Sequence, residues 1–220
     1  MSEILSPDKN PAYGEWTSLP DSIWNTLENL KDTPWPVEII RQSQGGYHLP
    51  FLGHILLIYS TKRHMEWKDL SRTPTFQEGL VALTFLANFK MISLSKKWIT
   101  PAELPGGRTF FSPRSHPPKT SSILKAWENR PAFFHRVMTQ LGATSLPHGD
   151  EAFEIPCLPL LPFRYVFWEG EPSLPSSVTL LVNATAHLFL PLDVLWALIN
   201  LVDERFTDHH PLCEGCREMV

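Results

Sequence analysis

The sequence predicts a single α+β domain, in which a mainly antiparallel sheet packs against a few helices. Two observations carry this prediction. Strand-like apolar runs follow one another in groups that are closed by turn residues, and helix-like segments lie before, between and after these groups. A long apolar helix pattern then follows the last group. Elements segregated in this way favour an α+β fold over a doubly wound one, in which strands and helices alternate.

The second group of strand-like runs is the clearest. Ala152–Ile155, Phe163–Trp168 and Ser177–Val182 are rich in aromatic and branched residues, and prolines lie between them. Runs of this length and composition, separated by turn residues, are typical of consecutive strands. We therefore expect these runs to form neighbouring strands.

The period of the sequence changes between Leu192 and Phe206, where it predicts a helix. The polar positions Asp193, Asn200 and Asp203 with Glu204 fall on one narrow stripe of that helix. A helix that is apolar over most of its circumference must be covered by other elements. We expect it to be the core helix, with Trp196 and Leu198 buried on its covered side.

The first half of the chain predicts a three-stranded meander over Val37–Arg41, Tyr47–Leu52 and His54–Tyr59. A short helix from Asp21 to Lys31 precedes it. After it, Thr75 and Glu78 form a capping-box pattern that predicts a helix to about Met91.

Further along, Ile123, Leu124 and Trp127 indicate a short helix, and Pro131 suits the first turn of another that stops at Gly142. The sequence divides into an extended, proline-containing arm at 1–20, the α+β domain at 21–206 and a polar tail at 207–220.

Composition limits the classes of function. The chain has 220 residues, of which 43% are hydrophobic and 19% charged, and its formal net charge is −4. An acidic chain without clustered lysine and arginine argues against nucleic-acid binding. The first ten residues lack the pattern of a signal peptide, and the longest apolar runs are far shorter than a membrane span of about 20 residues. We expect a cytoplasmic protein that does not enter the membrane.

A glycine pair is the first candidate ligand site. In Leu104-Pro105-Gly106-Gly107-Arg108, successive backbone N–H groups can approach an anion and Arg108 can add charge. A phosphate loop would have more glycines and a following helix, whereas Thr109–Phe111 is predicted as a strand. A Pro-Gly turn that requires positive φ explains the pair without any ligand.

His148, Asp150 and Glu169 combine an imidazole with two carboxylates, which suits general acid–base catalysis or one metal ion. A loop in which Asp150 bonds backbone amides explains the first two residues equally well. His187, in a link between a strand and the core helix, is a candidate axial ligand of a corrinoid or haem. A lone histidine is also compatible with a plain surface or core position.

The tail contains four soft metal ligands within eight residues: His209, His210, Cys213 and Cys216. Two thiolates spaced C-x-x-C can hold one zinc ion or contribute half of an iron–sulfur site. A polar chain end without a ligand and a C-x-x-C redox pair are the other interpretations.

Four segments, taken together in their order, carry a resemblance to a known family. They are LPGG at 104–107, GD at 149–150, LPLLPFRYVFWEGE at 158–171 and LPLDVLWALINLVDERF at 190–206. From about Val37 to Phe206 the chain resembles the domain of unknown function 3786 family of anaerobic bacteria and archaea. The resemblance implies a setting beside corrinoid and one-carbon enzymes, and an acidic residue is common in the family where this chain has Asn183. Some longer members begin with a cysteine-rich iron–sulfur segment. This chain has no cysteine before Cys157, so we expect no such segment within it.

Three functions follow as expectations. The first, which the resemblance implies, is a non-catalytic accessory or binding protein in anaerobic redox or one-carbon metabolism. Its expected partner is another protein, or a redox or corrinoid protein. The second is a hydrolase or transferase that uses His148, Asp150 and Glu169. The third is a structural subunit that binds another protein. For a cofactor, the sequence predicts zinc or iron at the tail.

Overall fold

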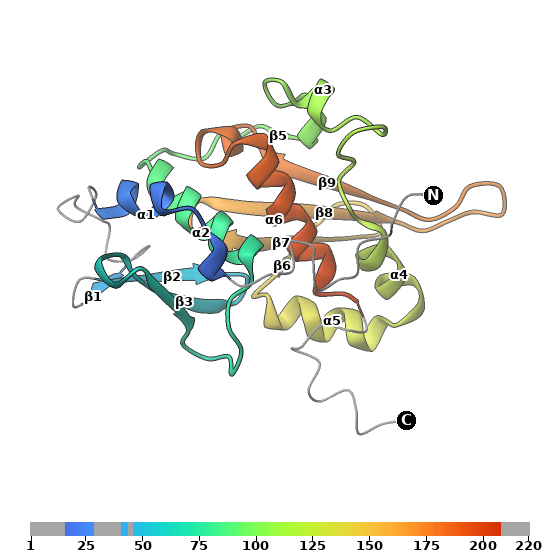
Figure 1. Ribbon diagram of the computed structural model, residues 1–220. Helices are drawn as coiled ribbons and strands as arrows, with labels where there is room; N and C mark the ends of the chain where they lie inside the picture. The colour runs from blue at the N-terminus through green and yellow to red at the C-terminus, as the bar shows by residue number, and fades with distance from the viewer. Residues whose placement is uncertain (1–15, 29–40, 44–45, 208–220) are drawn as a thin grey trace, which may run out of the picture.

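The computed structural model describes residues 16–28, 41–43 and 46–207, and it shows an α+β chain with two antiparallel sheets (Figure 1). The predicted fold class is therefore confirmed. The arm before Trp16 lies outside the described residues, but Trp16 and Leu19 at its end are buried against the helix that contains Gly79.

The larger sheet has the strand order β5-β9-β8-β7-β6. The three predicted strands form its centre, each somewhat longer than expected, and two short strands form its edges. The bounds are β5 (Trp98–Ile99), β6 (Thr144–Ser145), β7 (Glu151–Leu158), β8 (Leu161–Trp168) and β9 (Ser177–Asn183). A register shift between Ile155 and Leu158 bends β7 near the place where the smaller sheet meets it.

The smaller sheet is a meander with the order β1-β2-β3-β4. Its strands are β1 (Arg41–Ser43), β2 (Gly46–Phe51), β3 (His54–Tyr59) and β4 (His64–Trp67). Residues 37–40 of the first predicted strand lie outside the described residues. The sequence did not predict β4, because the alternation of polar and apolar residues over His64–Trp67 is only four residues long.

The turn between β2 and β3 joins the two sheets. Leu52 N–H donates to the carbonyl oxygen of Cys157 on β7 at 3.0 Å. Gly53 has φ +82°, and a Cβ at this position would lie 2.0 Å from the carbonyl oxygen of Gln140. Only glycine therefore permits this close approach of the turn to the neighbouring helix.

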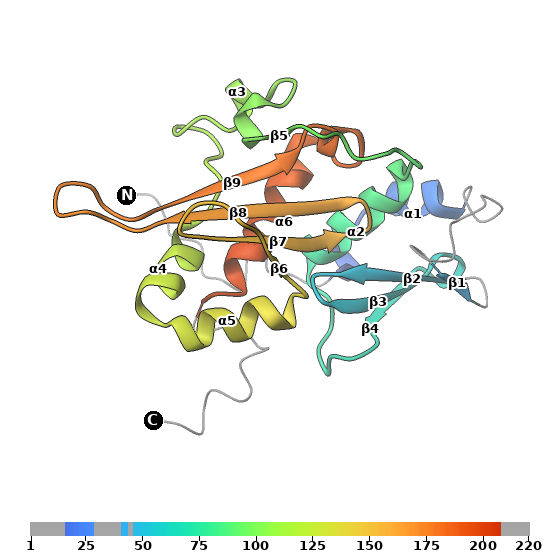
Figure 2. The same ribbon diagram turned by 180° about the vertical axis from the view of Figure 1, so that it is seen from behind.

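Two helices cover one face of the larger sheet. In Figures 1 and 2, α2 (Phe76–Asn88) and α6 (Leu192–Glu204) lie side by side on this face. The capping box is confirmed, since Glu78 N–H donates to Thr75 Oγ1 and Thr75 N–H donates to Glu78 Oε2. The other helices are α1 (Asp21–Glu28), α3 (Gly107–Phe110), α4 (Ser121–Asn129) and α5 (Pro131–Gln140).

The buried side of helix α6 is not the side that the sequence predicts. Leu198 is completely buried, but Trp196 is only half-buried and donates its Nε1–H to the carbonyl oxygen of Pro117 at 3.3 Å. Asn200 and Asp203, expected on a solvated stripe, are 1% and 3% exposed. Asp203 is buried because of a long-range contact: its carboxylate accepts hydrogen bonds from backbone N–H groups at the start of α4.

Within the described ranges, no helix combines the length and the apolar composition that crossing a bilayer requires.

Candidate functional site

Two of the three predicted acid–base residues come together in space. Asp150 immediately precedes β7 and Glu169 immediately follows β8, and these strands are antiparallel neighbours. Asp150 Oδ2 accepts a hydrogen bond from the backbone N–H of Glu169 at 2.7 Å. The two carboxylates therefore share the same end of the sheet.

A pocket of about 720 Å³ opens at this end of the sheet. Four carboxylates line it, and no lysine or arginine is among the lining residues. Its walls come from the end of α4, the start of β7 and the hairpin between β8 and β9. The lining residues are Trp127, Glu128, Asn129, Asp150, Glu151, Glu169, Gly170 and Ser176.

His148 does not line this pocket. It lies on an exposed loop, where Gly149 (φ +60°) lets the chain pass close to β8: a Cβ on Gly149 would lie 2.6 Å from the carbonyl oxygen of Phe167. The structure thus brings together the two acids of the predicted constellation and leaves its histidine outside the pocket.

Trp127 forms a fixed aromatic wall. Its Nε1–H donates to Glu151 Oε2 at 2.6 Å, and its ring packs against Phe167 with the ring centroids 5.0 Å apart. His135 Nε2 lies 3.7 Å from the other oxygen of Glu151. By contrast, Glu128 and Glu169 are exposed, and their carboxylates make no hydrogen bond with another described residue. Two acids of the pocket are therefore held in place, and two are free to meet a ligand.

The first turn of helix α4 is bonded to α6, the core helix. Asp203 Oδ1, on α6, accepts hydrogen bonds from Ser122 N–H at 3.0 Å and from Ile123 N–H at 3.1 Å. The carboxylate thereby satisfies two of the four N–H groups that the first turn of a helix leaves without a partner. Since Trp127 and Glu128 are on α4, this contact also sets one wall of the pocket.

The glycine pair has a structural explanation. Gly106 has φ +76°, as a Pro-Gly turn requires, and a Cβ on Gly107 would lie 2.2 Å from the carbonyl oxygen of Pro101. The expected strand at Thr109–Phe111 is wrong, because this segment lies in and just after the short helix α3. Arg108 is exposed on this helix. A helix of only four residues offers little of the dipole on which anion binding depends.

His187 lies in a short 3-10 helix, η6 (Ala186–Leu188), and is half-buried. Its Nδ1 is buried and has no hydrogen-bond partner among the described residues. Nowhere in the described ranges do three or more His, Cys, Asp or Glu side chains form a group that could hold a metal ion. His209, His210, Cys213 and Cys216 lie outside the described residues, so metal binding by the tail stays a prediction.

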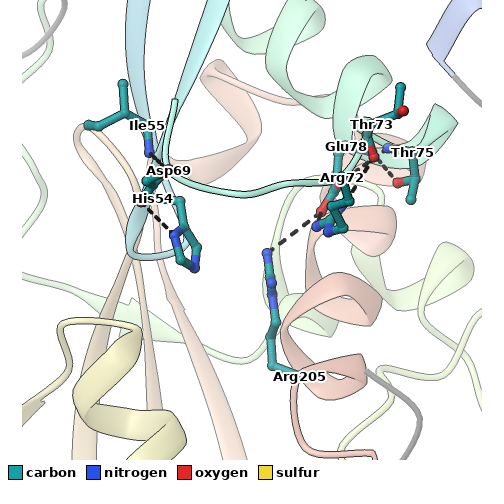
Figure 3. A network of polar contacts seen from close by, with 8 residues as sticks. All are labelled: His54, Ile55, Asp69, Arg72, Thr73, Thr75, Glu78 and Arg205. Atoms are coloured by element: carbon teal, nitrogen blue, oxygen red, sulfur yellow. Dashed lines mark hydrogen bonds and ion pairs between the residues drawn. The ribbon is translucent and has the colours of Figure 1, made fainter. Parts of the chain in front are cut away.

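A buried cluster of charges, which the sequence did not predict, ties α2 to α6 (Figure 3). Arg72 donates from both terminal nitrogens to the carboxylate of Glu78, at 2.7 and 2.5 Å. Arg205 Nη2, from the end of α6, lies 3.6 Å from Glu78 Oε1. Glu78 is 1% exposed and Arg205 is 4% exposed, so both charges are removed from water.

The pKa shifts of this cluster follow from burial and from the charge partners. Burial alone would raise the pKa of Glu78, but the hydrogen bond and charge of Arg72, with the charge of Arg205, hold it below its ordinary value of 4.5. Burial lowers the pKa of Arg205 to about 10. Both groups are therefore charged at neutral pH, and the cluster acts as an ionic link inside the fold.

A second polar contact in Figure 3 joins β3 to the loop that follows β4. His54 Nδ1 lies 2.7 Å from Asp69 Oδ2, and Ile55 N–H donates to Asp69 Oδ1 at 3.3 Å. Nothing in the sequence pairs residues 15 positions apart in this way, so sequence reasoning did not find this contact.

Most of the chain matches the model of one protein family. The model of the family described as Domain of unknown function (DUF3786) matches residues 35–205. The chain belongs to the DUF3786 family. The predicted resemblance to this family is thereby confirmed. No curated protein and no solved structure matches the chain.

The DUF3786 match includes every residue that lines the acidic pocket and also Asn183. The side chain of Asn183 is buried and accepts a hydrogen bond from Ser95 N–H at 3.1 Å, while its amide donates to the carbonyl oxygen of Ser95 at 2.8 Å. An ionised acid could accept but could not donate. In this DUF3786 chain, Asn183 therefore pins the segment before β5 to the end of β9.

Proposed function

We propose that the protein is a non-catalytic accessory protein, which binds a cationic side chain of a protein partner in the acidic pocket. The observation that carries this proposal is the pocket itself, which combines four carboxylates with the ring of Trp127 and has no basic lining residue. An aromatic face and carboxylates together favour ammonium and guanidinium groups over neutral or anionic ones.

The arrangement of the four acids supports binding of an organic cation. Asp150 and Glu151 are held by hydrogen bonds to Glu169 N–H and to Trp127, which fixes the positions of two of the four acids. Glu128 and Glu169 are exposed and free to move toward a ligand. The net charge of −4 adds a weak, long-range attraction for a basic partner.

The setting in anaerobic redox or one-carbon metabolism, with a redox or corrinoid protein as the partner, rests on the family resemblance and forms part of the proposal. A hydrolase or transferase that uses His148, Asp150 and Glu169 has less support, because His148 lies outside the pocket lining. A purely structural subunit would not require a pocket of this charge.

The proposal predicts that a blocked tetralysine peptide binds wild-type protein and shifts the indole N–H resonance of Trp127 in an NMR titration. The double variant Glu128→Gln/Glu169→Gln should bind roughly tenfold more weakly, since each exposed charge pair contributes up to about 1 kcal/mol. Higher salt should weaken the binding to wild type, because salt screens exposed charges.

Glu66→Gln is the control, because Glu66 is exposed on β4 and does not line the pocket. This variant should bind as wild type does. Equal binding by the double variant and wild type, or a titration that leaves the Trp127 resonance in place, would remove the pocket as the binding site.

A further inference from the structure

Strand β9 has an edge that is only partly covered. Its neighbour on that side is β5, which pairs with two of its residues, Trp98 with Asn183 and Ile99 with Val182. Figure 2 shows β9 running on well past β5 toward the hairpin. Among the described residues, the stretch Ser177–Leu181 therefore pairs with β8 on one side and with no strand on the other.

The hydrogen-bond pattern shows which backbone groups face this open edge. Ala184 N–H donates to the carbonyl oxygen of Lys97, beside β5. Because N–H and C=O groups alternate between the two edges of a strand, the groups of Val182, Leu180 and Val178 face the same way. Val182 is paired with β5, but the outward groups of Val178 and Leu180 have no backbone partner among the described residues.

Strand β9 itself carries none of the residue types that protect exposed strand edges from pairing. The sequence of β9, SVTLLVN, contains no charged residue and no proline. The outer strand of the smaller sheet, β4, differs in this respect, because it carries the exposed side chains of His64 and Glu66. Natural proteins guard long edges with charges, prolines or covering segments, so an unguarded edge favours pairing with another chain.

The charged residues at the two ends of the edge indicate which way a strand added there would run and where its own charges would lie. Glu169 and Glu171 are exposed at its hairpin end, and Lys96 and Lys97 are exposed beside β5. Trp168, which pairs with Ser177, is 47% exposed at the hairpin end and offers an apolar contact. A strand that continues the direction of β5 would end beside the glutamates.

We propose that the open edge of β9 takes an extended segment of another protein as an added antiparallel strand. The segment has small apolar or β-branched residues, and basic residues at its C-terminal end, which meet the acidic hairpin. Main-chain hydrogen bonds to Val178 and Leu180 hold it, as in other cases of strand addition. The acidic pocket and this edge share Glu169, but main-chain pairing at Val178 and Leu180 belongs to the edge alone, so variants at Val178 test the edge separately.

Hydrogen exchange tests the free edge directly. In free protein at low concentration, the amides of Val178 and Leu180 should exchange at least about tenfold faster than those of Thr179 and Leu181, whose N–H groups face β8. A blocked peptide of alternating threonine and valine that ends in two lysines should slow exchange at Val178 and Leu180. A peptide with the lysines at its N-terminal end should bind more weakly.

The matched variants are Val178→Pro and Val178→Thr. Proline removes the outward N–H, which the free protein does not use, whereas threonine keeps both this group and the side-chain shape. Val178→Pro should weaken peptide binding about tenfold and Val178→Thr should not. If Val178→Pro does not fold, the same contact can be tested on the peptide. A peptide that is N-methylated on its pairing edge should not bind wild-type protein.

Three outcomes would overturn the proposal. The first is slow exchange at Val178 and Leu180 in dilute free protein, which would mean that the edge is already paired. The second is protection that appears with rising protein concentration together with the mass of a dimer, which would assign the edge to a second copy. The third is unchanged peptide binding by Val178→Pro.

Discussion

Replacing Glu78 with glutamine should lower the free energy of unfolding by about 3–5 kcal/mol, the usual cost when a buried charge loses its partner. The carboxylate of Glu78 pairs with Arg72 and with Arg205, which is itself 4% exposed. A neutral amide leaves the buried guanidinium of Arg205 without compensation and removes the charge partner of the partly exposed Arg72. In a chain of this size the melting temperature should fall by roughly 10 °C, measured by calorimetry.

Glu103→Gln is the matched control for this variant. Glu103 also occupies the third position of a capped turn, and its Oε2 accepts a hydrogen bond from Thr100 N–H at 2.8 Å. It is exposed and has no buried guanidinium beside it. Glu103→Gln should therefore melt close to wild type, and equal melting temperatures for the two variants would contradict the role of the ion pair.

The pH dependence of the Glu78→Gln effect has a definite sign. The folded-state pKa of Glu78 lies below its ordinary value of 4.5. Its contribution to stability is therefore complete above pH 4.5 and is lost as the pH falls through the folded pKa. Burial raises the pKa of Glu204, so the contribution of that residue changes in the opposite direction. The difference between wild type and Glu78→Gln should shrink in acid, since only wild type can protonate at this position.

Leu198→Ala should cost about 2–5 kcal/mol, because it removes a large side chain from a closely packed core and leaves a cavity. Leu198 has no exposed surface. Leu192→Ala is the control, since Leu192 is on the same helix but only half-buried, and it should lose clearly less stability. Chemical denaturation of both variants measures the difference, and equal losses would mean that α6 presents a different face to the sheet.

Local sequence signals predicted most of the elements. The strands around Phe163 and the helix that starts at Pro131 are marked by features within a few residues, namely branched and aromatic runs, prolines and a stopping glycine. The capping box of α2 is equally local, since Thr75 and Glu78 are three residues apart. Signals of this range can be read without knowledge of the fold.

Contacts between distant residues could not be predicted in this way. The short helix α3 depends on the close approach of Gly107 to Pro101. The sequence instead predicted a strand there, because Thr109–Phe111 has the composition of one. The burial of Asp203 depends on residues 80 and 81 positions away. For the candidate site, the sequence named Asp150 and Glu169, but only the fold adds the wall formed by Trp127 and Glu128.

The bond between Asp203 and α4 has a consequence for the order in which the chain folds. An isolated helix of nine residues is unstable in water, and the side chain of Thr120 makes no capping bond that would start α4 locally. We infer that α4 nucleates only after α6 has docked on the sheet and presents its carboxylate. Native-state hydrogen exchange should then give Ile123 and the last turn of α6 the same opening free energy. The pocket wall and the end of the core helix would thus form and unravel as one cooperative unit, although Ile123 and Asp203 are 80 positions apart along the chain.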